Sequence, residues 1–429
     1  MSRSPRDAAL TVLERCRRGG AWSDAVLDAV LTESGLSGRD AALCTRLCTG
    51  CIQNAALCDF YIDCYSSVKT KKLEPKILDI LRLGVYQLVF MDRIPAHAAV
   101  SQGVSQARRA NHKAAGLVNA VLRRVSENLE KLPEVPGKGT AEHLAVKYSH
   151  PLWLCRTLIE ERGYDFAEAL LRENNAAPSP TAQVNTLKTT AAELREKLAE
   201  EGAECTGTKV PNALELSSAG DIKKLQSFRD GLFYIQDNAA RMAVLTAGPK
   251  PGMRVLDACA APGGKSFAAA IAMENRGEIV SCDIHEKKLA RIENTAKRLG
   301  IDIISTRPMD ARRPAEEFRE YFDMVLADVP CSGIGVIRKK PDIRAKSEED
   351  TLRFPEIQLD ILRGLSHTVK PGGVLLYSTC TVLRRENEEL AGAFLRENGD
   401  FALEGEMRTL FPNTDGTDGF FICKLRKKA

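Results

Sequence analysis

A chain of 429 residues is too long for one ordinary domain, and at about 150 residues per domain it predicts two or three. Charged residues make up 28% of the chain but the formal net charge is only +4, so any binding of nucleic acid must come from local basic patches. No run of roughly 18 apolar residues occurs, and the 13 cysteines lack small-domain disulfide spacing. These features disfavour a membrane or secreted protein, and we expect a cytosolic one.

Helical periodicity dominates the first part of the chain. From residue 6 to residue 125 apolar residues recur at helical spacing, as at Ile77, Leu81, Val85 and Leu88, and few stretches alternate as strands do. Residues 132–140 contain two prolines and two glycines, which interrupt this periodicity. The sequence therefore predicts an all-α domain over residues 1–132, followed by a linker.

Four cysteines lie close together in this helical part, at positions 44, 48, 51 and 58. Such a group suggests zinc or an iron–sulfur cluster. The spacing instead places the thiols on one helical face among leucines, and neither a pair of Cys-x-x-Cys motifs nor a nearby histidine completes a recognised metal site. We therefore expect these cysteines to pack in the core, and we expect no bound metal.

Residues 141–235 combine helical and strand patterns. Residues 191–202 form an amphipathic pattern typical of a helix, and residues 181–186 are a short strand candidate. This region is predicted to be a small α/β adaptor module, and the sequence does not indicate its role.

Strands alternate with helices from residue 236 to residue 429. The predicted buried strands are residues 254–258, 278–282, 301–306, 324–327 and 374–378, and helical patterns separate most of them. This alternation predicts a Rossmann-like α/β domain with a mostly parallel, doubly wound sheet. In such a sheet, ligands bind at the carboxyl ends of the strands.

A glycine-bearing loop follows the first of these strands, which ends at Asp257. The loop joins this strand to a predicted helix. Such a layout binds nucleotide-like ligands, because the N-terminus of the helix offers free N–H groups. A phosphate-binding loop of the nucleotide triphosphatase type is disfavoured, since Cys259 stands where its first glycine belongs. The predicted cofactor-binding residues are Cys259, Ala260, Ala261, Pro262, Gly263, Gly264 and Lys265.

Acidic residues follow the next two strands. Asp283 ends the second strand, where a carboxylate can accept hydrogen bonds from both hydroxyls of a ribose. Asp310 follows the third strand and is placed to reach an adenine amino group. A single acid at such a position is usually a surface residue, but acids at successive strand ends favour a binding site.

Two cysteines follow two later strands. Asp328 and Cys331 come after the strand at 324–327, and Cys380 follows the strand at 374–378, so both thiols are expected at the ligand-binding edge. Carbon 5 of cytosine is a poor nucleophile, and a thiolate added at carbon 6 turns the base into an enamine that can attack a methyl sulfonium. Removing the proton at carbon 5 and expelling the thiolate need a second acid/base group. Asp328 is expected to hydrogen-bond the base edge and favour protonation at N3.

These residues resemble the motifs of the Nop2/Sun family of RNA cytosine-C5 methyltransferases. The resemblance spans roughly residues 145–429, and its motifs are Asp257-x-Cys259-Ala260-Ala261-Pro262-Gly263-Gly264-Lys265, Asp328-x-Pro330-Cys331-Ser332-Gly333, Ser378-Thr379-Cys380-Thr381, Pro341-Asp342-Ile343, Glu386-Asn387-Glu388 and Asp418-Gly419-Phe420-Phe421. It implies S-adenosyl-L-methionine as cofactor, with Asp328 also beside the cofactor. It further implies that Cys380 attacks the base and that Cys331 assists product release. Cytosine-C5 DNA methyltransferases instead use the Pro-Cys thiol as nucleophile.

The helical part also resembles a known RNA-binding fold. Residues 83–88, 94–97 and 116–123 are similar to the antitermination factor NusB. A NusB-like domain fused to this catalytic domain is the arrangement of the RsmB type of bacterial enzyme, which implies a cytidine in 16S (small-subunit) ribosomal RNA as substrate. The basic residues expected to contact phosphates are Arg15, Arg17, Arg18, Lys69, Lys71, Lys72, Arg108, Arg109, Arg123 and Arg124.

The sequence therefore predicts a three-part enzyme that makes 5-methylcytidine in ribosomal RNA and acts as a monomer, without a membrane or a metal. Three alternatives stay open: a transfer RNA substrate, a non-catalytic RNA-binding assembly factor, and an amino-group methyltransferase. The last usually carries an aromatic residue after Asp/Asn-Pro-Pro, where this chain has Cys331 and Ser332. The sequence does not identify the target nucleotide, and it does not distinguish naked RNA from an assembling subunit.

Overall fold

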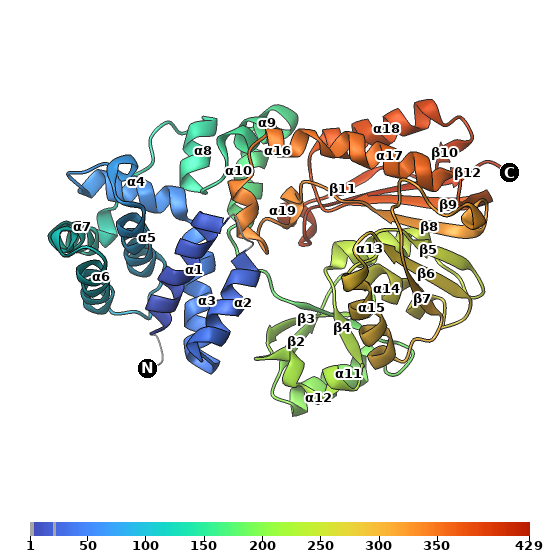
Figure 1. Cartoon of the computed structure of the whole chain (residues 1–429), viewed down its shortest axis with the longest axis horizontal. Coiled ribbons are helices and arrows are strands. Elements are labelled where there is room, and N and C mark those ends of the chain that lie inside the picture. Colours follow the sequence, from blue (N-terminus) through green and yellow to red (C-terminus); the bar gives the residue numbers. More distant parts are fainter. Residues whose placement is uncertain (1–3, 20–22) are drawn as a thin grey trace. The chain divides into compact units, whose positions relative to one another are not determined.

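The computed structural model describes residues 4–19 and 23–429, which form two compact units (Figure 1). Unit 1 comprises the described residues up to Ala176 together with residues 339–348, and unit 2 comprises residues 177–338 and 349–429. This division differs from the predicted boundaries at 132, 141 and 235, because the helices between residues 141 and 173 pack with the helical part. In the described part of the chain, no helix is both long and apolar enough to cross a membrane.

Unit 1 is all helical. Its α-helices are α1 (Pro5–Gly19), α2 (Ser23–Ser34), α3 (Gly38–Gln53), α4 (Ala55–Tyr65), α5 (Pro75–Phe90), α6 (Ala96–Ala110), α7 (Ala115–Glu127), α8 (Ala141–Lys147), α9 (Leu152–Arg162) and α10 (Tyr164–Glu173). Helix α5 contacts α1, α3, α4, α6 and α7, and it is buried on nearly all sides because apolar residues cover most of its surface. Gly50 lets α3 approach α5 closely, since a Cβ there would lie 2.0 Å from the ring of Tyr86.

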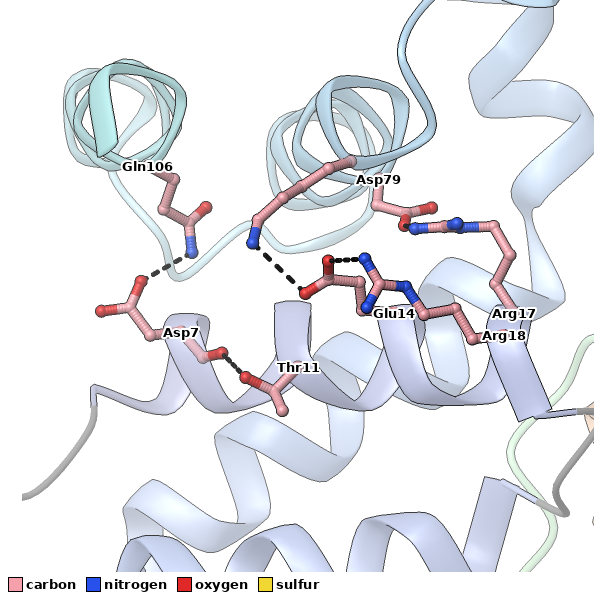
Figure 2. A network of polar contacts seen from close by, with 8 residues as sticks. Asp7, Thr11, Glu14, Arg17, Arg18, Asp79 and Gln106 are labelled. Atoms are coloured by element: carbon pink, nitrogen blue, oxygen red, sulfur yellow. Dashed lines mark hydrogen bonds and ion pairs between the residues drawn. The ribbon is translucent and has the colours of Figure 1, made fainter. Parts of the chain in front are cut away.

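Charged side chains of α1 pair with residues of neighbouring turns and helices, as Figure 2 shows. Arg17 donates through Nε and Nη2 to Oδ2 of the buried Asp79 on α5, at 3.2 and 3.1 Å. Glu14 accepts from both Arg18 and Lys76, each at 3.3 Å. These ion pairs stabilise the packing of α1 against α5. They also engage basic side chains that were predicted to contact RNA phosphates.

The predicted phosphate-contacting residues therefore fall into two groups. Six already bind an acid or a backbone carbonyl: Arg15, Arg17, Arg18, Lys69, Arg109 and Arg124. The other four are exposed and have no ion pair within the described residues: Lys71, Lys72, Arg108 and Arg123. The second group is the better candidate for phosphate contacts, because its charges are not already neutralised.

A short segment from later in the chain completes unit 1. The 3₁₀-helix η7 (Pro341–Ala345) contacts α3. Arg344 donates to the side chain of Asn175 at 2.5 Å, and the backbone carbonyl of Lys346 accepts from the indole of Trp153 at 3.0 Å. Unit 1 thus includes residues 339–348, which no local pattern indicated.

Unit 2 begins with a small antiparallel sheet in the order β2-β3-β1-β4. Its elements are β1 (Thr181–Val184), α11 (Ala191–Glu200), β2 (Glu204–Gly207), β3 (Ala213–Ser218), α12 (Gln226–Arg229) and β4 (Phe233–Ile235). Helix α11 starts with a capping box, in which the Thr190 hydroxyl accepts from Glu193 N–H and the Glu193 carboxylate accepts from Thr190 N–H. The helix buries Leu194 and Leu198, so residues 181–235 form a small α/β fold within the range 141–235 that was predicted for such a module.

The large sheet has the order β10-β12-β9-β8-β5-β6-β7, with β11 paired to β12. Its strands are β5 (Arg254–Asp257), β6 (Glu278–Asp283), β7 (Ile304–Pro308), β8 (Phe322–Asp328), β9 (Val369–Thr379), β10 (Phe401–Leu403), β11 (Arg408–Leu410) and β12 (Phe420–Lys427). Strands β5 to β9 run parallel, as predicted, and β12 pairs antiparallel with β9. Strand β7 begins three residues later than predicted, because the chain first turns through the left-handed Gly300.

Helices cover both faces of this sheet, so each central strand is apolar on both sides (Figure 1). Leu326 of β8 packs in the layer of α13 (Asn238–Ala247), α14 (Gly264–Ala272) and α15 (Glu286–Leu299). Val325, one residue earlier, packs in the layer of α17 (Phe354–Ser366) and α18 (Glu388–Glu397). The polar residues that end the strands therefore gather at one edge, between the two layers.

Candidate active site

The sheet order brings the predicted site residues to neighbouring strand ends. Along the edge, Cys380 follows β9, Asp328 ends β8, Asp257 ends β5, Asp283 ends β6 and Asp310 follows β7. Asp328 is the register partner of Ser378 in the parallel pair of β8 and β9. The two cysteine motifs are therefore adjacent, and they lie beside the loop that follows β5.

The loop after β5 is shaped for a close approach to a ligand. Ala260 N–H donates to the carbonyl of Cys282 at 2.7 Å, which folds the loop over the end of β6. Gly263 has φ of 104°, and a Cβ there would lie 2.5 Å from the ring of Phe267. Gly264 then begins α14, so free N–H groups of the helix end face the same edge. Residues 259–265, predicted to bind the cofactor, lie together in this loop and first turn.

Asp257 is fully buried at the base of this loop. Its Oδ2 accepts a hydrogen bond from Ser266 Oγ at 2.6 Å, whereas Oδ1 is buried without a partner. Burial raises the pKa of Asp257 from 3.8 to about 6. A buried carboxylate oxygen without a donor is costly, and a cationic N–H donor of a ligand would satisfy it.

The two outer acids have different surroundings. Asp283 accepts from the backbone N–H of His285 through Oδ1 at 2.9 Å, and its side chain is 11% exposed. Asp310 accepts from the Arg312 guanidinium through both oxygens, at 3.0 to 2.7 Å, and this pairing lowers its pKa. A ligand amino group would therefore have to share Asp310 with Arg312. If S-adenosylmethionine binds at this edge, its ammonium, ribose and adenine groups are donors from which Asp257, Asp283 and Asp310 could accept in this order.

Lys265 and Asp328 form an ion pair between the cofactor loop and the Cys331 motif. The Nζ atom of Lys265 lies 2.5 Å from Oδ2 of Asp328 and 5.1 Å from the centre of the Phe420 ring. Burial opposes the charge on Lys265, but the attraction of Asp328 outweighs it and the pKa of Lys265 is raised. Oδ1 of Asp328 accepts from Ser378 Oγ at 3.0 Å. The Asp328 side chain is still 27% exposed despite this ion pair.

Cys331 and Cys380 face each other, with their Sγ atoms 3.0 Å apart. The hydrogen bond with Cys380 raises the pKa of the Cys331 thiol, and burial raises it further. Asp328 adds negative charge nearby, which acts in the same direction. Either sulfur can be the donor in this contact, which couples the protonation of the two thiols.

The backbone around these thiols is closely packed. Ser332 Oγ donates to Thr381 Oγ1 at 2.8 Å, and Gly335 N–H donates to the carbonyl of Cys380 at 3.0 Å. A Cβ on Gly335 would lie 2.0 Å from the carbonyl oxygen of Gly419, so the two glycines must face each other. This contact explains why the terminal Asp-Gly-Phe-Phe motif has a glycine. No role for that glycine was predicted from the sequence.

Three further residues contact the cysteine loops and were not predicted as site residues. Glu386 and Asn387 belong to a motif that the sequence noted, but nothing in it indicated their contacts. Gln358 lies on the buried face of α17, where the sequence gave no signal, because a single glutamine in an amphipathic helix is usually exposed. Its Nε2 donates to the carbonyl of Pro330 at 3.0 Å.

The four clustered cysteines belong to unit 1. Cys44, Cys48, Cys51 and Cys58 are each at most 1% exposed and belong to the apolar core, as the helical spacing predicted. Within residues 4–19 and 23–429, no group of three or more His, Cys, Asp or Glu side chains is arranged to hold a metal ion.

Comparisons with known proteins match three successive parts of the chain. Residues 3–127 match the NusB family, residues 150–223 match the ferredoxin-like domain of RsmF/B-like methyltransferases, and residues 244–426 match the family of 16S rRNA methyltransferases RsmB/F. The chain is 38% identical to the probable ribosomal RNA small subunit methyltransferase B of Bacillus subtilis (strain 168), over 99% of both chains. Identity to the corresponding protein of Synechocystis sp. is 32%, again over 99% of both chains. The crystal structure of a methyltransferase homolog protein from Pyrococcus horikoshii is 26% identical and covers 66% of this chain and 97% of its own, with a TM-score of 0.60.

Proposed function

The chain belongs to the RsmB family of ribosomal RNA small subunit methyltransferases, and we propose that it transfers a methyl group from S-adenosylmethionine to carbon 5 of a cytidine in 16S ribosomal RNA. The observation that carries the cytosine-C5 chemistry is the pair of facing thiols at the ends of β8 and β9, with Sγ atoms 3.0 Å apart, beside the cofactor loop. An amino-group methyltransferase has no use for two thiols at this edge.

Cys380 is the proposed nucleophile. Its thiolate adds to carbon 6 of the base, which forms a C–S bond and moves the electrons of the C5=C6 double bond toward carbon 5. S-adenosylmethionine, when bound, supplies an electrophilic methyl group and leaves as the neutral thioether. Asp257, Asp283 and Asp310 would hold its ammonium, ribose and adenine groups, and residues 259–265 would enclose it. The base, activated by Cys380, takes the methyl group at carbon 5.

Cys331 is the group proposed to assist product release. Carbon 5 must lose its proton to solvent, and the electron pair of that C–H bond re-forms the double bond while the bond from carbon 6 to Cys380 breaks. The departing sulfur gains negative charge, and the Cys331 thiol can donate a hydrogen bond to it. The 3.0 Å contact between the two sulfurs supports this assignment, because it places the Cys331 thiol beside the sulfur that would depart.

Variants of the two cysteines test this proposal. Cys380→Ala should abolish methylation and give no protein–RNA adduct, since no enamine can form. Cys331→Ala should attack and methylate the base but release it slowly, so that a denaturant-resistant complex with methylated RNA accumulates. The double variant should lose that complex. If the adduct survives Cys380→Ala and disappears in Cys331→Ala, the roles are reversed, and if neither change affects methylation the covalent mechanism is wrong.

The RNA target needs a separate experiment. Bisulfite sequencing of RNA from a strain that lacks this protein should show one missing 5-methylcytidine in 16S ribosomal RNA. Restoring the wild-type chain should return the mark, whereas the Cys380→Ala chain should not. Loss of the mark from transfer RNA alone would redirect the assignment. Unchanged methylation in both RNAs would favour a non-catalytic assembly factor.

A further inference from the structure

Two consecutive residues, Glu386 and Asn387, are fully buried beside the thiols, and the reaction described above gives neither of them a role. Glu386 is the last residue of the 3₁₀-helix η8 (Arg384–Glu386), and Asn387 directly precedes α18. The hydroxyl of Tyr377 on β9 donates to the Glu386 carbonyl at 2.5 Å, which ties this turn to the sheet. Their side chains point to different neighbours, and each neighbour carries one of the two cysteines.

Glu386 binds the loop that carries Cys331. Its Oε2 accepts from the backbone N–H of Ser332 at 2.8 Å and from Nε2 of Gln358 at 2.9 Å. The same Gln358 nitrogen also donates to the carbonyl of Pro330. The residues on both sides of Cys331 are thus held through one carboxylate oxygen.

Asn387 binds the turn that carries Cys380. Its Oδ1 accepts from Thr379 Oγ1 at 2.6 Å, and its Nδ2 donates to the carbonyl of Thr381 at 3.0 Å. The residues on both sides of Cys380 are therefore held by a single side chain.

The cost of burying Glu386 argues against a simple packing role. Its second oxygen, Oε1, is buried without a hydrogen-bond partner, so the carboxylate loses hydration that the protein does not fully replace. An apolar residue of similar size would avoid that cost but would leave the Ser332 N–H and one of the two Gln358 N–H groups without an acceptor. The carboxylate is thus matched to the position of the Cys331 loop.

We propose that Glu386 and Asn387 form a clamp of two positioning residues, in which Glu386 fixes Cys331 for product release and Asn387 fixes Cys380 for attack. This inference rests on the proposed roles of the two cysteines. Loss of each side chain should therefore impair a different step of the same reaction, although the two residues are neighbours in sequence and equally buried.

Two RNA substrates separate these steps. With ordinary transcribed 16S ribosomal RNA and radiolabelled S-adenosylmethionine, the amount of denaturant-resistant complex reports slow release. With the same RNA containing 5-fluorocytidine, carbon 5 has no proton to lose, so the rate of complex formation reports attack and methyl transfer alone. All measurements use the full chain, and cofactor affinity and thermal unfolding are recorded for every variant.

Glu386→Ala should accumulate the complex on ordinary RNA, with release slowed about ten- to a hundredfold, and should react with fluorinated RNA at the wild-type rate. Asn387→Ala should show the opposite pattern, with slower reaction on fluorinated RNA and no accumulation on ordinary RNA. Combining Glu386→Ala with Cys331→Ala should slow release no further than Cys331→Ala does, because both changes affect one step.

Conservative variants distinguish position from charge. Glu386→Gln keeps an acceptor for the Ser332 N–H and should behave like the wild type. Glu386→Asp keeps the charge, but its side chain is one methylene shorter and the carboxylate lies farther from Ser332, so this variant should trap the complex. This pair also replaces Glu386→Ala if that variant does not fold. The exposed neighbour Glu389→Ala is the matched control and should have no effect.

The outcomes separate this inference from the proposed function. If Cys331→Ala traps no complex, the proposed roles of the cysteines fail, whatever the clamp variants do. If Cys331→Ala traps the complex but Glu386→Ala does not, only the clamp is refuted. The clamp is also refuted if Glu386→Asp behaves like the wild type while Glu386→Gln traps, or if the Glu386 and Asn387 variants slow both steps in parallel with weaker cofactor binding.

Discussion

Replacing Asp257 by asparagine should stabilise unit 2 at neutral pH and at the same time weaken binding of S-adenosylmethionine. The carboxylate is fully buried, one of its oxygens has no donor, and burial raises its pKa from 3.8 to about 6. The folded chain therefore holds a proton that the unfolded chain has already lost between these two pH values. In that window the free energy of unfolding falls as pH rises.

The size of the effect follows from the shift in pKa. A rise from 3.8 to about 6 corresponds to about 3 kcal/mol of destabilisation once the pH is well above 6. The amide of the variant cannot ionise and still accepts from Ser266, but its nitrogen lacks a partner, which costs about 1 kcal/mol or more. We expect a net gain of about 1–2 kcal/mol at pH 7.5 and little or no gain at pH 4.

The cofactor should respond in the opposite direction. An ammonium group bound to the charged carboxylate contributes about 1.5–3 kcal/mol, so affinity should fall about ten- to a hundredfold in Asp257→Asn. Thermal unfolding from pH 4 to 8 and calorimetric titration of the cofactor at pH 7.5 measure the two effects. Parallel pH profiles of stability for variant and wild type would refute the reasoning, as would unchanged cofactor affinity.

The described contacts lead to three further predictions. Asp283→Ala should weaken cofactor affinity about ten- to a hundredfold with unit 2 still folded, and an unchanged titration would remove Asp283 from the site. Mild oxidation with a dithiol-specific azo compound, which is itself reduced to the hydrazine, should form a disulfide between Cys331 and Cys380, whose sulfurs lie 3.0 Å apart. Methylation should stop until a reductant is added. Peptide mapping that finds both thiols free after this treatment would contradict the prediction. Replacing Lys71 and Lys72 by Ala should weaken RNA binding and lower the salt slope by about 2, whereas replacing the ion-paired Arg15 should change binding less, and equal losses would contradict the division of basic residues.

The local pattern of the chain was sufficient to predict most of unit 2. All five predicted parallel strands are present, because a strand buried on both faces is a short apolar run that stands out between amphipathic helices. The loop from Cys259 to Lys265 was equally visible, since glycine at a strand-to-helix turn has a local steric cause. The C-terminal strand β12 was not predicted, because the sequence noted its Phe-Phe motif without indicating which strand it would pair with.

Other features depend on contacts between residues far apart in sequence. The chain divides at Ala176, and residues 339–348 pack with unit 1. Both features depend on which apolar faces pack against each other, and the periodicity of a single segment does not predict this. The same holds for the basic residues of α1. Their sequence pattern is that of an RNA-binding surface, but Arg15 and Arg17 pair with acids on α2 and α5, as Arg109 of α6 pairs with Asp7 of α1.

The candidate site shows the same division. The sequence alone placed Cys331 and Cys380 at the ends of two parallel strands, because carboxyl ends of such strands share one edge. Only the tertiary structure decided that β8 and β9 are neighbours, and so brought the two sulfurs to 3.0 Å. It also brought Glu386 and Asn387 into contact with the two loops that carry the thiols. A buried polar group bonds to whichever groups the packed chain places around it, so its partners cannot be predicted from sequence spacing.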